Sequence, residues 1–392
     1  MPTRREFLET TVKGAAGMAL AGGLASCASS QATQKEGARM LAKAKLVEVL
    51  KAAGKPTQAA TTPDGTTVLL LPYGGRVLGV YAAGSDENFY WTHTALESAE
   101  SAKAFYASKD WHNSGGDRTW LAPEVDIFLP NYPSKEGYFQ PRELDPGNYQ
   151  VVQADGGIKL VNRLTVNLGR SKQKLGLEIT KSIGPAANPL RYEHGLQLDG
   201  VQYAGYTQFT SMQITGDAAQ SQGPVGLWNL VQMPHGGDLL VPTFFRSQPT
   251  VCFGKVSNTD LIVDDHLIRY KMRATGEHKL TMRATASTGR VGYVYRTGDR
   301  WAAIIRNYVV NPSGEYVDPP WDAPNDMGYA TQACNVNGAL GTFSELEYHI
   351  PAIGKGTGRS RCDDAAQVWA FRGTERQIQT VVHNLLGVTR LM

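Results

Sequence analysis

The chain has 392 residues, of which 42% are hydrophobic and 19% are charged, and its formal net charge at pH 7 is +3. This composition is typical of a globular protein, and the small net charge excludes the strongly basic surface of a nucleic-acid-binding protein. Cys252, Cys334 and Cys362 are widely spaced, which argues against a zinc cluster and favours burial of the three thiols.

The N-terminal residues have the pattern of an export signal. Arg4 and Arg5 precede an apolar run that is too short to span a bilayer. Paired arginines in this position resemble a Tat signal, and the residues around Cys27 resemble a bacterial lipobox. We therefore expect residues 1–26 to be a signal peptide, Cys27 to carry a lipid anchor, and residues 27–63 to form a lipidated tether with one short helix. The expected product is an exported lipoprotein, anchored to a membrane and facing the periplasm or the cell exterior.

Residues 64–392 are predicted to form one domain rich in short strands. The β-rich runs are 66–71, 76–82, 88–91, 148–153, 157–167, 174–181, 196–199, 208–215, 226–232, 250–254, 266–274, 280–286, 291–295, 301–310, 328–335, 342–350 and 367–371. Helical spacing appears in residues 95–107 and again in 374–387, where Thr374 and Gln377 suit a capping box. Many strands with few helices predict an all-β, antiparallel sandwich or barrel.

Residues 343–351 are the most informative of these runs. Because side chains alternate across a strand, Glu345, Glu347 and His349 should share one face, and Leu346 and Tyr348 the other. Two carboxylates and an imidazole are costly to bury, so their face should look into solvent or a polar cleft. A plain solvated strand surface would have the same pattern.

A second polar cluster surrounds the paired glycines at positions 115 and 116. It contains His112, Asp117, Arg118, Trp120 and Glu124. Tryptophan faces stack on sugar rings, while guanidinium and carboxylate groups form directional hydrogen bonds with hydroxyls. The cluster therefore favours a carbohydrate cleft, although a structural ion pair beside a core tryptophan would also explain parts of it.

A third segment, residues 226–238, places Trp228 and His235 beside glycines at a strand end. His235 could donate a proton near neutral pH, or it could be an ordinary loop histidine. Motifs for phosphate binding, dinucleotide binding, serine hydrolysis and zinc proteolysis are absent from the sequence. We expect no cofactor and no metal.

Three segments, residues 68–77, 115–120 and 346–351, together resemble the galactose mutarotase-like (aldose 1-epimerase-like) β-supersandwich family, and its exported bacterial members most closely. The resemblance implies a large β-supersandwich in which Glu347 is the general base and a histidine is the acid. His112 corresponds to the first histidine of that family's substrate loop, but the segment matching its acid-bearing run has no histidine. Either His235 supplies the acid from a shifted position, or this protein does not perform mutarotation.

The leading hypothesis is an exported lipoprotein that binds a carbohydrate and, in its catalytic form, acts as a sugar epimerase. Glu347 and His235 are the candidate catalytic residues. The candidate sugar-binding residues are His112, Asp117, Arg118, Trp120, Glu124, Trp228, Glu345 and His349. The alternatives are a non-catalytic sugar-binding lipoprotein and a glycan hydrolase or lyase on the same fold.

Overall fold

The computed structural model describes residues 41–154, 157–216 and 223–391. The predictions for the signal peptide and for Cys27 lie outside the described residues. Among the described residues, no helix is both long enough and apolar enough to cross a membrane.

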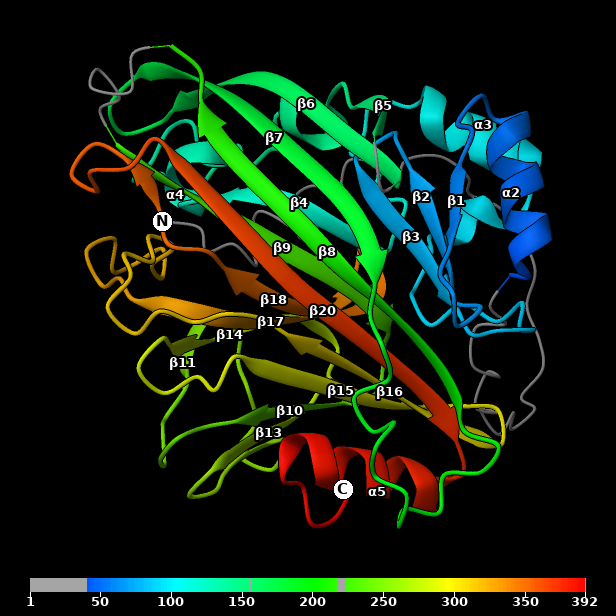
Figure 1. Cartoon of the computed structure of the whole chain (residues 1–392). Helices are drawn as coiled ribbons and strands as arrows, with labels where there is room; N and C mark the ends of the chain where they lie inside the picture. The colour runs from blue at the N-terminus through cyan, green and yellow to red at the C-terminus, as the bar shows by residue number, and fades with distance from the viewer. Residues whose placement is uncertain (1–40, 155–156, 217–222, 392) are drawn as a thin grey trace, which may run out of the picture.

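Two large antiparallel sheets build the described part of the chain, each with ten strands (Figure 1). The first sheet runs in the order β1 (Gln58–Thr61), β2 (Thr67–Leu71), β3 (Arg76–Tyr81), β4 (Asp117–Ala122), β9 (Pro224–Pro234), β18 (Gly341–His349), β17 (Tyr329–Gly338), β14 (Gly276–Arg283) and β11 (Thr250–Phe253), and β19 (Ile353–Gly354) pairs with β9. The second sheet runs in the order β12 (Leu261–Val263), β13 (Leu267–Lys271), β10 (Asp238–Pro242), β15 (Arg290–Thr297), β16 (Arg300–Asn307), β20 (Arg361–Gly373), β8 (Gln202–Ile214), β7 (Gln173–Pro185), β6 (Gly157–Leu168) and β5 (Gln150–Ala154).

The main hydrophobic core lies between the two sheets. The inward-facing side chains of β18, Leu346 and Tyr348, belong to this core together with Val231 of β9 and Val368 of β20. Burying apolar area on this scale is the main favourable contribution to folding. The structure confirms the predicted all-β class, with two antiparallel sheets packed as a sandwich.

Short helices pack on the outer faces of the sheets, and a helix was predicted near each end of the domain. The C-terminal helix α5 (Glu375–Leu386) has the expected capping box between Thr374 and Gln377, and Gly387 ends it in the left-handed conformation with φ +70°. Its apolar face packs on β15, β16 and β20. At the opposite end, α2 (Lys43–Ala52) and α3 (Ala99–Ala107) lie beside β1 to β3 (Figure 1). The remaining helical segments are η1 (Thr94–Glu97), α4 (Glu124–Ile127) and η2 (Glu143–Gly147).

The strand predictions were wrong in several places. Residues 88–91 and 196–199 form turns and loops, where the Asn88 side chain accepts hydrogen bonds from the backbone N–H groups of Val80 and Tyr90. Strands β1, β4, β10, β12 and β19 were not predicted, and β1 lies within residues 27–63, which were predicted to be a tether with one short helix. The polar start of β4 suggested a loop, because neither face of this strand is uniformly apolar.

A buried ion pair links the two sheets beneath β4. The Asp117 carboxylate accepts hydrogen bonds from Arg306 of β16 and from the Tyr206 hydroxyl of β8, and the side chains of Asp117 and Arg306 are both 0% exposed. Asp117, predicted to bind substrate, therefore faces the interior of the sandwich. Its role is to neutralise a buried guanidinium.

This geometry predicts the effect of breaking the pair. Asp117→Asn should lower the free energy of unfolding by about 3–5 kcal/mol, because Arg306 would remain buried and uncompensated. The double variant Asp117→Asn/Arg306→Met should recover part of that loss. Denaturant unfolding of the three proteins checks this, and an equal loss in the single and double variants would contradict it.

Candidate functional site

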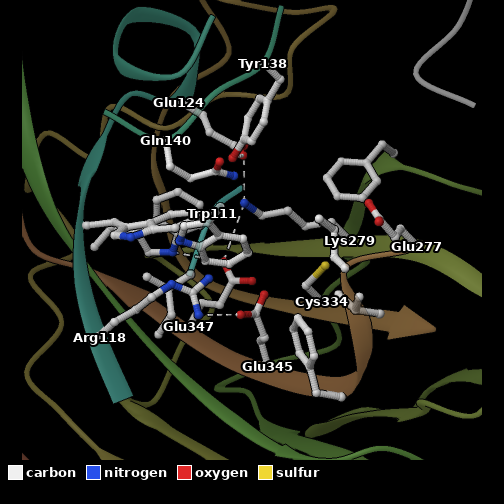
Figure 2. Close-up of a pocket in the computed structure, with 17 residues that line it drawn as sticks. Trp111, Arg118, Glu124, Tyr138, Gln140, Glu277, Lys279, Cys334, Glu345 and Glu347 are labelled. Atoms are coloured by element: carbon white, nitrogen blue, oxygen red, sulfur yellow. Dashed lines mark hydrogen bonds and ion pairs between the residues drawn. The ribbon is translucent and has the colours of Figure 1, made fainter. Parts of the chain in front are cut away.

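A cleft lies on the face of the first sheet that is turned away from the second sheet. It contains about 440 Å³ of empty space, part of it open to solvent (Figure 2). Its lining comes from β4, β9, β14, β17 and β18 and from two loop segments around Trp111 and Tyr138. Of the predicted site residues, the cleft brings together Arg118, Trp120, Glu124, Trp228, Glu345 and Glu347.

The alternation predicted for β18 places both carboxyl groups in this cleft. Glu345 and Glu347 are only 5% and 1% exposed, so they face a polar cleft and not a solvated surface. Leu346 and Tyr348 point the other way, into the core between the sheets. Both faces of this strand are therefore buried.

The ammonium group of Lys279 lies at the bottom of the cleft among three carboxyl groups. Its Nζ is 3.4 Å from Glu124 Oε2, 3.5 Å from Glu347 Oε2 and 3.9 Å from Asp318 Oδ2. Burial by itself would lower the pKa of Lys279, but these carboxylates together raise it above its usual value. Lys279 is thus a fixed positive charge and not a proton donor.

Glu347 is the titratable group of the cleft. Burial is the main cause that raises its pKa to about 8; Lys279 opposes the rise, and the carboxylates of Glu345 and Glu124 add to it. The indole Nε1–H of Trp228 donates a hydrogen bond of 2.9 Å to Glu347 Oε2. At neutral pH Glu347 is therefore mostly protonated, and it can exchange its proton within the physiological range.

Glu345 has different surroundings. Its Oε1 lies 2.8 Å from Arg118 Nη1 and accepts a hydrogen bond of 3.0 Å from the Gln232 side chain. A carboxyl oxygen of Glu345, one of Glu347 and the Cys334 Sγ lie within 4.8 Å of one another. The cleft thus holds one carboxylate stabilised by a guanidinium beside one carboxyl group that retains its proton.

The tryptophans of the cleft hold the charged groups in place. The Arg118 guanidinium lies 4.1 Å from the Trp120 ring centroid, and Lys279 Nζ lies 4.2 Å from that of Trp228. Trp120 and Trp111 both donate their indole N–H groups to Asp145, each at 2.9 Å. The Arg118 guanidinium also lies 5.3 Å from the Trp111 ring centroid. Trp111 is half-buried whereas Trp120 and Trp228 are buried, so Trp111 is the better candidate for stacking on a ligand.

Three predicted histidines do not line the cleft. His235 bonds Asn335, whose side chain lies on the opposite face of the first sheet, so His235 is separated from Glu347 by the sheet itself. His112 packs among Phe105 and other aromatic side chains beside α3. His349 stacks behind Trp228, and burial together with Lys279 lowers its pKa well below the usual value. The proposed acid, His235, therefore has no access to a ligand beside Glu347.

Several residues of this site were not predicted from the sequence. Lys279, Asp318 and Asp145 were not singled out because each lies far along the chain from its partners. Alternation along β14 places Lys279 on one face with Glu277 and Thr281, a polar pattern that is also typical of a solvated strand surface, so no local signal marked it. Asp318 lies in a loop without any distinguishing local pattern.

Cys334, Glu345 and Glu347 are close enough together to be considered as metal ligands. However, the Arg118 guanidinium lies 2.8 Å from Glu345 and the Lys279 ammonium lies 3.5 Å from Glu347. A divalent cation would have to lie beside these two positive charges, which disfavours its binding. This donor set therefore fits carboxyl acid–base chemistry better than metal coordination.

Comparison with known proteins gives a family but no activity. No curated protein matches the sequence. Among solved structures the fold is similar to a galactose 1-epimerase from Lactobacillus acidophilus NCFM, with 8% identity and a TM-score of 0.38 over 81% of this chain and 94% of that chain. It is also similar to an alpha-galactosidase from Lactobacillus brevis, with 10% identity and a TM-score of 0.29 over 84% of this chain and 41% of that chain. Both TM-scores are low, so neither likeness assigns an activity.

A family model described as "Family of unknown function (DUF6786)" matches residues 43–391. This match covers all of the strands and both terminal helices of the described structure. The cleft is therefore built entirely from residues within the matched region. The chain belongs to the DUF6786 family.

Proposed function

We propose that the protein binds a carbohydrate in this cleft and catalyses proton transfer at its anomeric centre, as a sugar epimerase of the mutarotase type. The observation that carries the proposal is a pair of neighbouring carboxyl groups with different environments. Glu345 lies against the Arg118 guanidinium, whereas burial raises the pKa of Glu347. Two carboxyl groups whose environments differ in this way are the usual signature of an acid and a base in one site. The sequence resemblance to the galactose mutarotase-like family supports the same reaction.

The roles follow from the charges around each group. Protonated Glu347 gives its proton to the ring oxygen of the sugar, while the Glu345 carboxylate takes the proton of the anomeric hydroxyl. The bond between the anomeric carbon and the ring oxygen breaks, and an open-chain aldehyde forms. Rotation of the aldehyde and closure by the reverse proton transfers yield the other anomer. Glu347 is then the acid and not the base that the resemblance implied, and no histidine is needed.

The ring oxygen and the anomeric hydroxyl are bonded to the same carbon, so an acid and a base must reach two oxygens that are separated by one atom. Carboxyl oxygens within 4.8 Å of each other can do this from one side of the sugar. Arg118 and Lys279 hold both groups in position, and Trp111 offers an indole face for the sugar ring.

A retaining glycoside hydrolase is a second candidate, favoured by the same short separation. In such enzymes the two carboxyl groups lie about 5–5.5 Å apart, with one acting as acid and the other as nucleophile. Glu347 would be the acid and Glu345 the nucleophile. Release of reducing sugar from an oligosaccharide panel distinguishes this reaction from epimerisation.

Export and lipidation remain part of the proposed function, supported by the twin arginines and the lipobox-like residues around Cys27. If this is correct, cells grown with labelled palmitate should incorporate the label into the wild-type protein. Cys27→Ser should abolish the labelling while the protein is still made. Equal labelling of both proteins would contradict the lipid anchor.

Glu347→Gln provides the test of catalysis. The variant should lower the rate of anomer exchange about 10²–10⁴-fold, because the acid is lost while the shape of the side chain is kept. Exchange is measured by NMR with a panel of hexoses. Glu178→Gln, on the second sheet and paired with Arg163, serves as the matched control and should leave the rate unchanged.

The outcomes separate the candidate functions. Exchange that is equally fast in wild type and Glu347→Gln would refute the catalytic role of this residue. Sugar binding without any exchange or hydrolysis by the wild type would instead identify a non-catalytic sugar-binding protein.

A further inference from the structure

The polarity of the cleft changes along strands β17 and β18. On β18 the side chains that face the cleft are Glu347, Glu345 and then Phe343, because every second residue of a strand shares a face. On β17 Cys334 lies beside Glu345 (Figure 2), and Val336 lies beside Phe343. Both strands therefore pass from the carboxyl groups to apolar side chains within a short length of chain.

This change gives the cleft an apolar end, formed by Val336, Leu340 and Phe343. All three side chains line the cleft, and Leu340 packs against the buried Val336 and Phe343. Glu277 of β14 stands in register with Val336, on the side away from Phe343. Because Val336, Leu340 and Phe343 carry no hydrogen-bonding group in their side chains, a ligand hydroxyl placed against them would lose its hydrogen bonds with water.

The apolar end lies beyond Glu345 as seen from Glu347. In the proposed reaction Glu347 gives its proton to the ring oxygen, and Glu345 takes the proton of the anomeric hydroxyl. The ring oxygen then lies toward Glu347, and C2, which is bonded to the anomeric carbon on its other side, lies toward the apolar end. Phe343 follows Glu345 at a distance of about 7 Å along the strand, so a short substituent on C2 can reach it.

The substituent that fits this end is small. Val336 and Phe343 are 3% and 1% exposed, so they offer a ligand an apolar surface of about the size of a methyl group. An acetamido group on C2 supplies this methyl group and also an amide N–H beside Glu345. The contacts of Glu345 with Arg118 and Gln232 use Oε1, and its other oxygen can accept the amide N–H.

We propose that the cleft takes 2-acetamido-2-deoxyhexoses in preference to plain hexoses, with the methyl group of the acetamide against Val336, Leu340 and Phe343. The inference rests on the proposed function, because that reaction determines which way the sugar lies in the cleft. It adds the chemical class of the sugar. A plain hexose would direct its 2-hydroxyl toward the same apolar end and would gain no methyl contact there.

The test compares three ligands that differ only at C2: a hexose, its 2-formamido analogue and its 2-acetamido analogue, each in the gluco, galacto and manno configurations. The formamido sugar keeps the amide but lacks the methyl group. Dissociation constants are measured by calorimetric titration of the full-length protein. In the configuration that binds, the acetamido sugar should bind about three- to tenfold more tightly than the formamido sugar, because its methyl group is buried. The hexose should bind most weakly.

A variant of the apolar end sharpens the test. Val336→Thr keeps the shape of the side chain and replaces one methyl group with a hydroxyl, so the ratio of acetamido to formamido affinity should fall toward one. Both ligands are measured on the same protein, so a partial loss of folded protein leaves this ratio unchanged. Val151→Thr, at an exposed valine of β5 in the second sheet, is the matched control and should keep the wild-type ratio.

Each outcome bears on a different claim. Equal binding of the acetamido and formamido sugars, or tightest binding of the plain hexose, would overturn the methyl site while leaving a sugar-binding protein. A wild-type ratio in Val336→Thr would also overturn it. If no sugar of any configuration binds and none shows accelerated anomer exchange, the proposed function fails and this inference fails with it.

Discussion

The structure of the cleft depends on one buried positive charge. Lys279 is 3% exposed, and its ammonium group lies between Glu124 of α4, Glu347 of β18 and Asp318 of a loop. A buried ammonium is costly unless carboxylates compensate it, and here these segments, far apart in the sequence, meet at one point to do so. The same cation limits the rise in the pKa of Glu347, which ties the packing of the site to its chemistry.

A second buried ion pair supports the strand that carries Arg118. Asp117 and Arg118 are neighbours in β4, so their side chains point to opposite faces: Asp117 to Arg306 between the sheets, and Arg118 to Glu345 in the cleft. The strand is therefore fixed from both sides by charge pairs. This arrangement keeps Arg118 against Glu345, whereas Glu347 shares the ammonium of Lys279 with Glu124 and Asp318. The proposed acid and base depend on this asymmetry.

The sequence was sufficient for features that depend on local pattern. Alternation along residues 343–351 correctly placed Glu345 and Glu347 together, and the caps of α5 were recognisable from Thr374, Gln377 and Gly387. It was insufficient where the role of a side chain depends on partners that are far away in the sequence. Strand β4 was missed because neither of its faces is uniformly apolar, and the role of Lys279 depends on three carboxyl groups elsewhere in the chain. His235 was chosen for its chemistry, but the sheet places it on the wrong face.

The proposed acid–base chemistry requires Glu347 to hold a proton near neutral pH. The direct measurement is an NMR titration of the protein with ¹³C-carboxyl-labelled glutamate, in which the Glu347 resonance is identified by its loss in Glu347→Gln. A raised pKa means that the protonated form persists until the pH rises through the pKa of the folded state. We therefore expect the Glu347 resonance to titrate with a midpoint at about pH 8. A midpoint near the ordinary value of 4.5 would contradict it, because Glu347 would then be ionised at neutral pH and could not serve as the acid.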